Sequence, residues 1–181
     1  MQWLNEPAQW AVADGALTVR AEHGTDFWRT THYGYVRDSG HAYGDWYDGD
    51  LDLEVRVAGR YTHQYDQAGA MVRVDDRHWV KTGIEYVDGR IRLSTVITLD
   101  YSSWAVAELP AGGSDLGLHL TRRGDSVEVR YAVDDGQPEL ASVVYLPPGA
   151  PAFAGLMCAA PEGPGFDVTF YNLVIRRAGA P

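Results

Sequence analysis

The sequence is short of several residue types, and each shortage excludes a class of protein. Its single cysteine, Cys158, excludes an internal disulfide and a cysteine-rich metal site. Because Cys158 stands in an apolar stretch, we expect it to be buried in the core. No stretch approaches the roughly 18 consecutive apolar residues of a membrane span, and the first residues lack the pattern of a signal peptide. We therefore expect a soluble, cytoplasmic protein without a membrane partner.

Positive charge is also scarce. The chain carries 15 Lys and Arg against 25 Asp and Glu, a formal net charge of −10. Phosphate binding needs a basic surface, so nucleic acid is excluded as the expected partner, and a neutral or cationic ligand is easier to accommodate. Lys81 is the one lysine among these basic residues. This bias against lysine elsewhere suggests that an ammonium group is favoured at that position.

Helical periodicity, internal repeats, glycine-rich phosphate loops and the Gly-x-Ser-x-Gly elbow of serine hydrolases are missing as well. The six histidines show no close-spaced ligand motif, so we expect no bound metal and no cofactor. The acidic stretch Asp45–Asp50 loosely resembles a calcium loop. It lacks the acid spacing and the closing glutamate of an EF-hand, and a solvated turn is the favoured interpretation.

What the sequence does contain is glycine, tyrosine and tryptophan, with turn signals every 8–12 residues. This pattern predicts an all-β, two-sheet antiparallel sandwich of the jelly-roll type, as a single domain over residues 1–181. A slip in phase is expected near Tyr171. Strands are predicted at Gln9–Ala13, Leu17–Ala21, near Phe27–Thr31, Leu51–Ala58, Gln67–Val74, Asp115–Arg122, Ser126–Val133, Glu139–Leu146, Ala152–Ala159 and Phe166–Arg176.

Two predictions concern the N-terminal part. The Asp14-Gly15 pair predicts a hairpin turn, and the alternation around it places four side chains inward: Trp10, Val12, Leu17 and Val19. From Glu22 to Asp50 we expect a long irregular segment with a single short strand. Loops of this length in compact domains are usually functional or disordered, and this one is too rich in aromatic residues for disorder.

The stretch His78–Leu99 is the clearest element, because its Asp88-Gly89 pair favours a type I′ turn between two strands. The turn fixes the register and separates two faces. The apolar face pairs Tyr86 with Ile91, Ile84 with Leu93, Thr82 with Thr95, and Val80 with Ile97. The other face pairs Glu85 with Arg92, Gly83 with Ser94, Lys81 with Val96, and Trp79 with Thr98.

This second face extends onto neighbouring strands. A three-residue loop before His78 places Gln67, Met71 and Arg73 opposite Glu85, Lys81 and Trp79, and Trp104 could reach the face from a fourth strand. Two interpretations remain open. The face is ordinary solvent-facing surface of an antiparallel sheet, or it is a binding site.

Several motifs resemble the domain-of-unknown-function family typified by the fungal regulation-of-enolase protein. They are Asp26-Phe27-Trp28, Arg37-Asp38-Ser39-Gly40-His41, Tyr65-Asp66-Gln67-Ala68-Gly69, Trp79-Val80-Lys81-Thr82-Gly83-Ile84-Glu85, Ser94-Thr95-Val96-Ile97-Thr98, Ser103-Trp104 and Ala159-Ala160-Pro161. The resemblance implies a concanavalin A-like jelly roll, but no established reaction, because the family has none. Where the family pattern has Ser-Asp-Trp, this chain has Ser102-Ser103-Trp104, which puts a carboxylate role at Ser103 in doubt.

Sandwiches of this kind commonly bind carbohydrate on a concave sheet. Aromatic faces can stack on sugar rings while polar side chains bind hydroxyl groups. For the tryptophans, packing beneath the segment Glu22–Asp50 is an equal alternative. The candidate ligand-binding residues are Trp28, His41, Gln67, Trp79, Lys81, Glu85, Arg92 and Trp104.

A carbohydrate-active enzyme, hydrolase or lyase, is the second hypothesis. Glycosidases need two carboxylates, and Glu85 would act with Asp26 or Asp66 from a loop, or with Lys81. Lys81 stands about 13 Å along the strand from Glu85, at about 3.3 Å per residue, so we expect no direct influence of its charge. Arg92, opposite Glu85, is expected to keep that carboxylate ionised.

The leading hypothesis is therefore non-catalytic binding of a carbohydrate or sugar-derived ligand. A third hypothesis, a protein-interaction domain in sugar metabolism, rests on the family resemblance alone.

Overall fold

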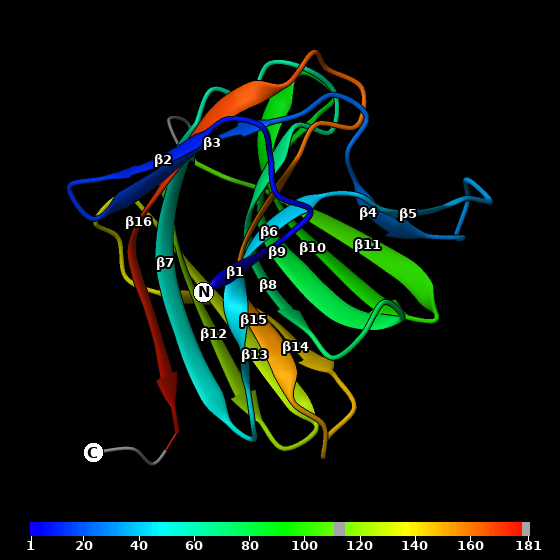
Figure 1. Cartoon of the computed structure of the whole chain (residues 1–181), viewed down its shortest axis with the longest axis vertical. Helices are drawn as coiled ribbons and strands as arrows, with labels where there is room; N and C mark the ends of the chain where they lie inside the picture. Colours follow the sequence, from blue (N-terminus) through cyan, green and yellow to red (C-terminus); the bar gives the residue numbers. More distant parts are fainter. Residues whose placement is uncertain (111–114, 179–181) are drawn as a thin grey trace.

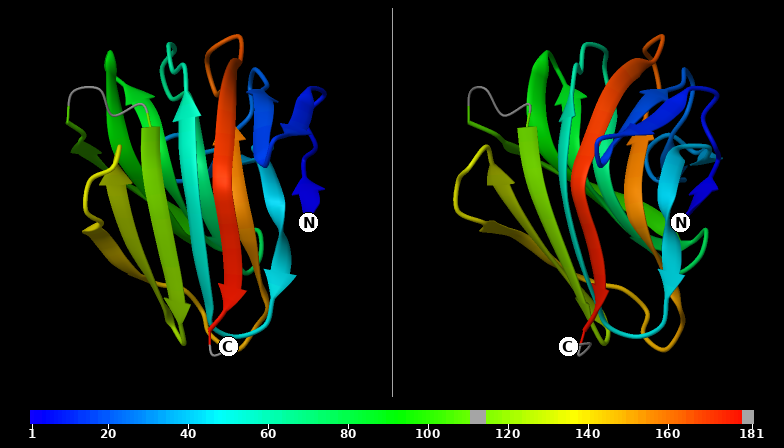
Figure 2. Two further views of the ribbon diagram at one scale, coloured as in Figure 1. Left: turned by 90° about the vertical axis from the view of Figure 1, so that its left-hand side faces the viewer. Right: turned by 60° about the vertical axis from the view of Figure 1, so that its left-hand side comes forward.

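The computed structural model describes residues 1–110 and 115–178, and within these ranges it consists of strands and loops. Two seven-stranded sheets lie face to face (Figure 1). Figure 2 shows β12, β7 and β16 side by side, with strands of the other sheet behind them. The all-β jelly-roll sandwich predicted from the sequence is thus confirmed. No helix in the described ranges could span a membrane.

We call the two sheets the front sheet and the back sheet. In spatial order the front sheet comprises β1 (Gln2–Leu4), β6 (His41–Tyr47), β15 (Ala152–Ala159), β8 (Gln67–Arg73), β9 (His78–Val87), β10 (Arg90–Leu99) and β11 (Tyr101–Glu108). The back sheet comprises β14 (Glu139–Tyr145), β13 (Ser126–Val133), β12 (Asp115–Arg123), β7 (Leu51–Gly59), β16 (Phe166–Arg177), β3 (Ala16–Ala21) and β2 (Trp10–Ala13). A separate small hairpin consists of β4 (Phe27–Arg29) and β5 (Val36–Asp38).

The registers predicted for the central strands are confirmed. Glu85 lies opposite Arg92 on β10 and opposite Gln67 on β8, as the turn and loop lengths require. Asp88 and Gly89 both adopt positive φ, which the type I′ turn demands. The predicted slip near Tyr171 is a register shift between Tyr171 and Val174 in β16.

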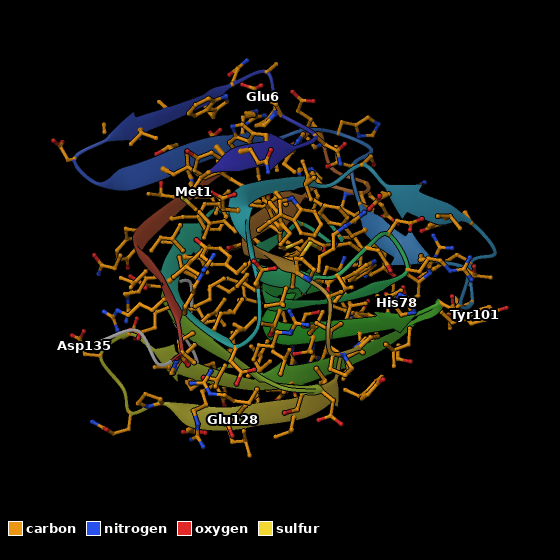
Figure 3. The ribbon with its side chains drawn as sticks, turned by 60° about the horizontal axis from the view of Figure 1, so that its bottom comes forward. Met1, Glu6, His78, Tyr101, Glu128 and Asp135 are labelled. Atoms are coloured by element: carbon orange, nitrogen blue, oxygen red, sulfur yellow. The ribbon has the colours of Figure 1, made fainter. Side chains whose placement is uncertain are left out.

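The core lies between the two sheets. Val80 and Ile84 of β9 pack there with Leu53 and Val55 of β7, and Cys158 is buried as expected. Figure 3 shows side chains filling this space, with Glu128 on the outside of the back sheet. The period-two alternation of the sequence therefore assigns one face of each sheet to the core.

The N-terminal hairpin differs from expectation in two of its four inward residues. Leu17 and Val19 are buried, but Trp10 is 41% exposed and Val12 is 61% exposed. Both lie on β2, the edge strand of the back sheet. At that edge the front sheet presents β1 and β6, and the Trp10 ring lies 5.5 Å from the ring of Trp3 on β1 and 6.2 Å from the ring of Tyr43 on β6. An edge strand has a neighbouring strand on one side only, and Val12 is left uncovered there.

The segment Glu22–Asp50 is more regular than predicted, because it contains β4, β5 and β6 rather than one short strand. The strand β6 pairs with both β1 and β15. Gly44 and Gly155 meet across β6 and β15 so closely that a Cβ on Gly155 would lie 2.6 Å from the Gly44 Cα. The glycine content of this segment suggested a loop. In the structure, Gly44 instead allows close approach of the backbones of two paired strands.

The hairpin β4–β5 covers part of the outer face of the front sheet, the face that carries Trp79, Lys81 and Glu85 (Figure 1). A second apolar layer forms where the hairpin packs on the sheet, and it consists of eight residues: Phe27, Trp28, Ala42, Met71, Trp79, Val96, Phe153 and Met157. The solvent-facing interpretation of this face is therefore wrong at its centre, where Lys81 is 4% and Glu85 is 6% exposed.

Candidate functional site

The candidate site is a pocket of about 250 Å³ between the β4–β5 hairpin and the outer face of the front sheet. It is somewhat smaller than the about 300–1,000 Å³ usual for drug-sized ligands, which suits one sugar-sized unit. Its lining residues are Asp26, Trp28, Tyr33, Tyr35, Arg37, Tyr65, Gln67, Lys81, Glu85, Val96, Trp104, Pro161 and Glu162.

The hairpin is tied to the sheet by buried polar contacts. Lys81 donates three hydrogen bonds, to the Phe27 carbonyl (2.8 Å), Gln67 Oε1 (2.6 Å) and Asp26 Oδ1 (3.3 Å). An ammonium group has three N–H donors, so these bonds use all of them. Lys81 thus pins β4 onto the sheet and is not available as a nucleophile, which explains the lysine at this position.

Two further contacts fix the ends of the hairpin. Arg73 of β8 forms a bidentate ion pair with Asp38 of β5, with Nη2 to Oδ2 at 2.8 Å. The Arg29 N–H donates to Ser102 Oγ of β11 at 2.8 Å. Figure 3 places Tyr101, the first residue of β11, at the hairpin end of the front sheet. The hairpin is therefore held by β8, β9 and β11 together.

Glu85 is a buried acid of the pocket floor. Trp104 Nε1 donates to Glu85 Oε2 at 2.9 Å and to Ser94 Oγ at 3.1 Å. Burial raises the pKa of the Glu85 carboxyl above its ordinary value, although the Lys81 ammonium and hydrogen bonds from Ser94 and Trp104 oppose the rise.

Two expectations about Glu85 are wrong. The charge of Lys81 does lower the pKa of Glu85, because the long lysine side chain reaches Gln67, the residue opposite Glu85. Arg92 does lie opposite Glu85, but its guanidinium pairs with Glu108 at 3.7 Å instead. No cation among the described residues lies within ion-pair distance of the Glu85 carboxylate.

Aromatic rings form two walls of the pocket. On the hairpin side Tyr33 stacks on Tyr35 with centroids 5.4 Å apart, and Trp28 meets Tyr33 edge to face at 5.6 Å. On the sheet side Tyr65 meets Trp104 edge to face at 6.1 Å. Such walls present flat apolar surfaces of the kind that stack on the C–H faces of ring-shaped ligands.

A hydroxyl bridge joins the two walls. Tyr33 and Tyr65 share a hydrogen bond of 3.3 Å between their hydroxyl groups. This bond, together with burial, raises the pKa of Tyr33 above its ordinary value. Exposed Glu162 and half-buried Arg37 lie at the rim, with the Arg37 guanidinium 4.5 Å above the Tyr35 ring.

Two glycines keep the sheet beneath the pocket closely packed. Gly83 lies between Lys81 and Glu85 on β9 and faces Gly69 on β8. A Cβ on Gly83 would lie 2.2 Å from the Ala68 carbonyl oxygen and 2.6 Å from the Gly69 Cα. No side chain fits between Lys81 and Glu85 without moving backbone.

Five of the eight residues proposed from the sequence line the pocket: Trp28, Gln67, Lys81, Glu85 and Trp104. The structure does not bring His41, Trp79 and Arg92 to it. Trp79 is 1% exposed and packs edge to face against Phe27 beneath the hairpin. His41 is a buried residue whose Nδ1 bonds the Asn5 carbonyl oxygen (2.7 Å), and whose Nε2 accepts from the Glu22 N–H (3.2 Å).

The two loop acids considered as partners for Glu85 are both engaged elsewhere. Asp26 lines the pocket, but its Oδ1 accepts from Lys81 and from the Phe27 N–H at 2.8 Å. Asp66 is buried outside the pocket lining and accepts from the N–H groups of Thr62 and His63. In the described ranges, no three His, Cys, Asp or Glu side chains gather closely enough to hold a metal ion.

Sequence reasoning missed six lining residues: Tyr33, Tyr35, Arg37, Tyr65, Pro161 and Glu162. A signal was present for most of them. Tyr33 and Tyr35 belong to the aromatic-rich segment, which loop statistics marked as functional. Arg37, Tyr65 and Pro161 stand inside motifs that carried the family resemblance. That these segments lie together in one pocket could be seen only in the folded structure.

Comparison with known proteins agrees with the resemblance. The model of the family described as "Protein of unknown function (DUF1349)" matches residues 3–178. "Regulation of enolase protein 1" of Saccharomyces cerevisiae is 38% identical over 168 residues, covering 93% of this chain and 85% of that protein. A solved structure described as a functionally unknown protein from Saccharomyces cerevisiae is 36% identical, with TM-score 0.94 over 99% of this chain and 97% of the other.

More distant solved structures share the fold. A GH43 protein of Bacillus licheniformis is 12% identical with TM-score 0.71, over 95% of this chain and 35% of the other. The carbohydrate-binding module CBM66 of Bacillus subtilis is 14% identical with TM-score 0.61, over 96% of this chain and 94% of the other. At these identities the likeness concerns the fold alone.

Proposed function

The chain belongs to the family of proteins of unknown function DUF1349, and from that premise and the pocket we propose non-catalytic binding of a carbohydrate or sugar-derived ligand. The observation that carries the proposal is the combination of five aromatic side chains with a buried polar floor in one pocket. Stacking surfaces and fixed hydrogen-bonding groups together recognise a sugar ring by its two kinds of surface. The fold that this chain shares with a carbohydrate-binding module supports the proposal.

The pocket shape also supports recognition of a single unit. The hydroxyl bridge between Tyr33 and Tyr65 connects the two aromatic walls, and Pro161 and Glu162 line another side. An extended polysaccharide chain would need an open groove across the sheet. A monosaccharide or the terminal unit of a glycan fits better.

The experiment is a glycan array followed by isothermal titration calorimetry on the glycans that bind. Trp104→Ala removes a pocket wall, and Trp46→Ala is the matched control, because Trp46 is 42% exposed on the same sheet outside the pocket. We expect binding at least about tenfold weaker in Trp104→Ala, about 1.4 kcal/mol, and unchanged in Trp46→Ala. Equal loss in both variants, or no glycan bound by the wild type, would contradict the proposal.

A glycoside hydrolase is the second candidate, because a carboxyl with a raised pKa suits a general acid. This candidate is weakened by the lack of a second carboxylate to act with Glu85 on the described pocket floor, since Asp26 is already bonded to Lys81. Release of product from a bound glycan that stops in Glu85→Gln would favour the enzyme over the binding module.

A further inference from the structure

Of the buried charged groups in the pocket, Lys81 has a partner of opposite charge among the described residues and Glu85 does not. Lys81 is neutralised by Asp26 and has no donor left for a ligand. Glu85 receives hydrogen bonds from neutral donors, and no described cation is ion-paired with it. A carboxylate that is 6% exposed and lacks a cationic partner is costly, and a cationic ligand group would offset that cost.

The walls around this carboxylate are suited to a cation as well. The π-faces of Trp and Tyr attract ammonium and guanidinium groups within about 6 Å of the ring centroid. The pocket already contains one example, because the Arg37 guanidinium lies 4.5 Å above the Tyr35 ring. Trp104 combines both features, since its ring is a wall of the pocket and its Nε1 holds the Glu85 carboxylate.

Long-range electrostatics favour the same ligand. The chain has a formal net charge of −10. The titratable groups that line the pocket are three acids (Asp26, Glu85 and Glu162), two basic residues (Arg37 and Lys81) and three tyrosines (Tyr33, Tyr35 and Tyr65). The acids outnumber the bases there, and a negative field raises the local concentration of cations at the entrance.

From these observations we propose that the bound ligand carries a free cationic amino group, as a hexosamine does, and that this group pairs with Glu85 between the aromatic walls. The inference rests on the proposed function and narrows its ligand class from sugars in general to amino sugars. The hydroxyl groups of such a ligand would bind the remaining polar groups of the floor. N-acetylation, which removes the charge, is expected to weaken binding.

Calorimetry separates this inference from the broader proposal. The probes are glucosamine, galactosamine and mannosamine, each compared with its neutral parent sugar and its N-acetyl derivative. The proteins are the wild type, Glu85→Gln and Glu162→Gln. The last variant removes the same unit of charge from the pocket rim. Thermal unfolding of each variant verifies that it is folded.

We expect at least one hexosamine to bind the wild type about tenfold or more tightly than its neutral parent. In Glu85→Gln the two affinities should converge, while in Glu162→Gln most of the preference should remain. Equal binding of amine and neutral sugar by the wild type would overturn the inference and leave the proposed function standing. Equal loss of the preference in both variants would also overturn it, because the effect would then be general electrostatics.

Tetramethylammonium serves as a third probe, because it is a cation without a sugar ring. Its competition with a bound hexosamine would support the placement of the amino group between the aromatic walls. Binding of tetramethylammonium alone, with no sugar of any kind bound, would contradict the proposed function, because the pocket would then be a site for organic cations. Failure of every hexosamine to bind would overturn the inference, whereas the proposed function is overturned only if the glycan array also shows no binding.

Discussion

The outer faces of both sheets carry charged side chains, but the environments of these side chains differ. On the back sheet, the outward residues form exposed ion pairs, such as Arg123 with Asp52 at 2.9 Å and Arg130 with Glu128 at 2.6 Å. On the front sheet, the outward residues Lys81 and Glu85 lie buried beneath the β4–β5 hairpin. Charged residues at outward positions of a strand are therefore the same signal on β9 as on the back sheet. The cover contributed by a distant segment decides which face forms a site.

The largest expected difference between the two faces is in the folding free energy lost when a cationic side chain is removed. Lys81→Met removes the group that neutralises buried Asp26, and leaving one charge of a buried pair unpaired costs about 3–5 kcal/mol. Arg123→Met breaks an exposed pair on the back sheet, for which about 0–1 kcal/mol is typical. Urea denaturation of both variants measures the difference. Similar losses in the two would contradict the role of Lys81 as the pin of the hairpin.

A smaller difference is expected from glycine substitutions on the same two faces. Gly83→Ala forces a Cβ against backbone atoms 2.2 and 2.6 Å away, and such overpacking costs about 1–3 kcal/mol. Gly117→Ala on the back sheet meets the end of the Arg56 side chain at 3.3 Å and Ala132 at ordinary contact distances of 3.6 and 3.8 Å, and we expect a change within about 0.5 kcal/mol. Midpoints of urea denaturation test these two variants, provided that the dependence of the unfolding free energy on urea concentration is the same in both. A neutral Gly83→Ala would show that the sheet beneath the pocket can relax.

The smallest effects concern pH, and they should have opposite signs on the two faces. Burial raises the pKa of Glu85 in the folded state, so folding favours its protonated form. Relative to Glu85→Gln, the wild type should lose stability as pH rises from about 4.3, the unfolded value, through the higher folded pKa. Above that folded pKa the difference should be constant.

Asp52 on the back sheet gives the matched comparison. Its burial acts to raise its pKa, but hydrogen bonds from Arg123 and Thr121 outweigh burial and lower it. Relative to Asp52→Asn, the wild type should therefore be favoured above about pH 3.9 and lose that advantage as pH falls through the folded pKa. Free energies of unfolding measured across pH 3–7 test both variants. Parallel curves for the two would refute the contrast.

The sequence allowed prediction of whatever depends on neighbours along the chain. The Asp88-Gly89 turn fixed the register of β9 and β10, and the three-residue loop before His78 fixed that of β8 and β9, which placed Gln67, Lys81 and Glu85 on one face. Alternation could not show what covers that face. The bond between Lys81 and the Phe27 carbonyl joins residues 54 positions apart, and no local pattern encodes such a contact.

The same limit explains the errors at single residues. Trp79 has the aromatic side chain expected of a ligand-stacking residue, and it lies on the predicted face. It packs under the hairpin only because Phe27 reaches it. Trp28 is a candidate because of its aromatic ring and its place in the Asp26-Phe27-Trp28 motif, and the hairpin brings it to the pocket. Residue type and face were therefore predictable, whereas depth beneath the hairpin was not.

The most direct test of sugar binding at this pocket uses the indole N–H signals of the six tryptophans in ¹H–¹⁵N correlation spectra, assigned by substitution. Addition of a glycan that binds should shift the signals of Trp28 and Trp104, which line the pocket, and leave those of exposed Trp10 and Trp46 in place. Shifts confined to Trp10 or Trp46, with Trp28 and Trp104 unmoved, would contradict binding at this site.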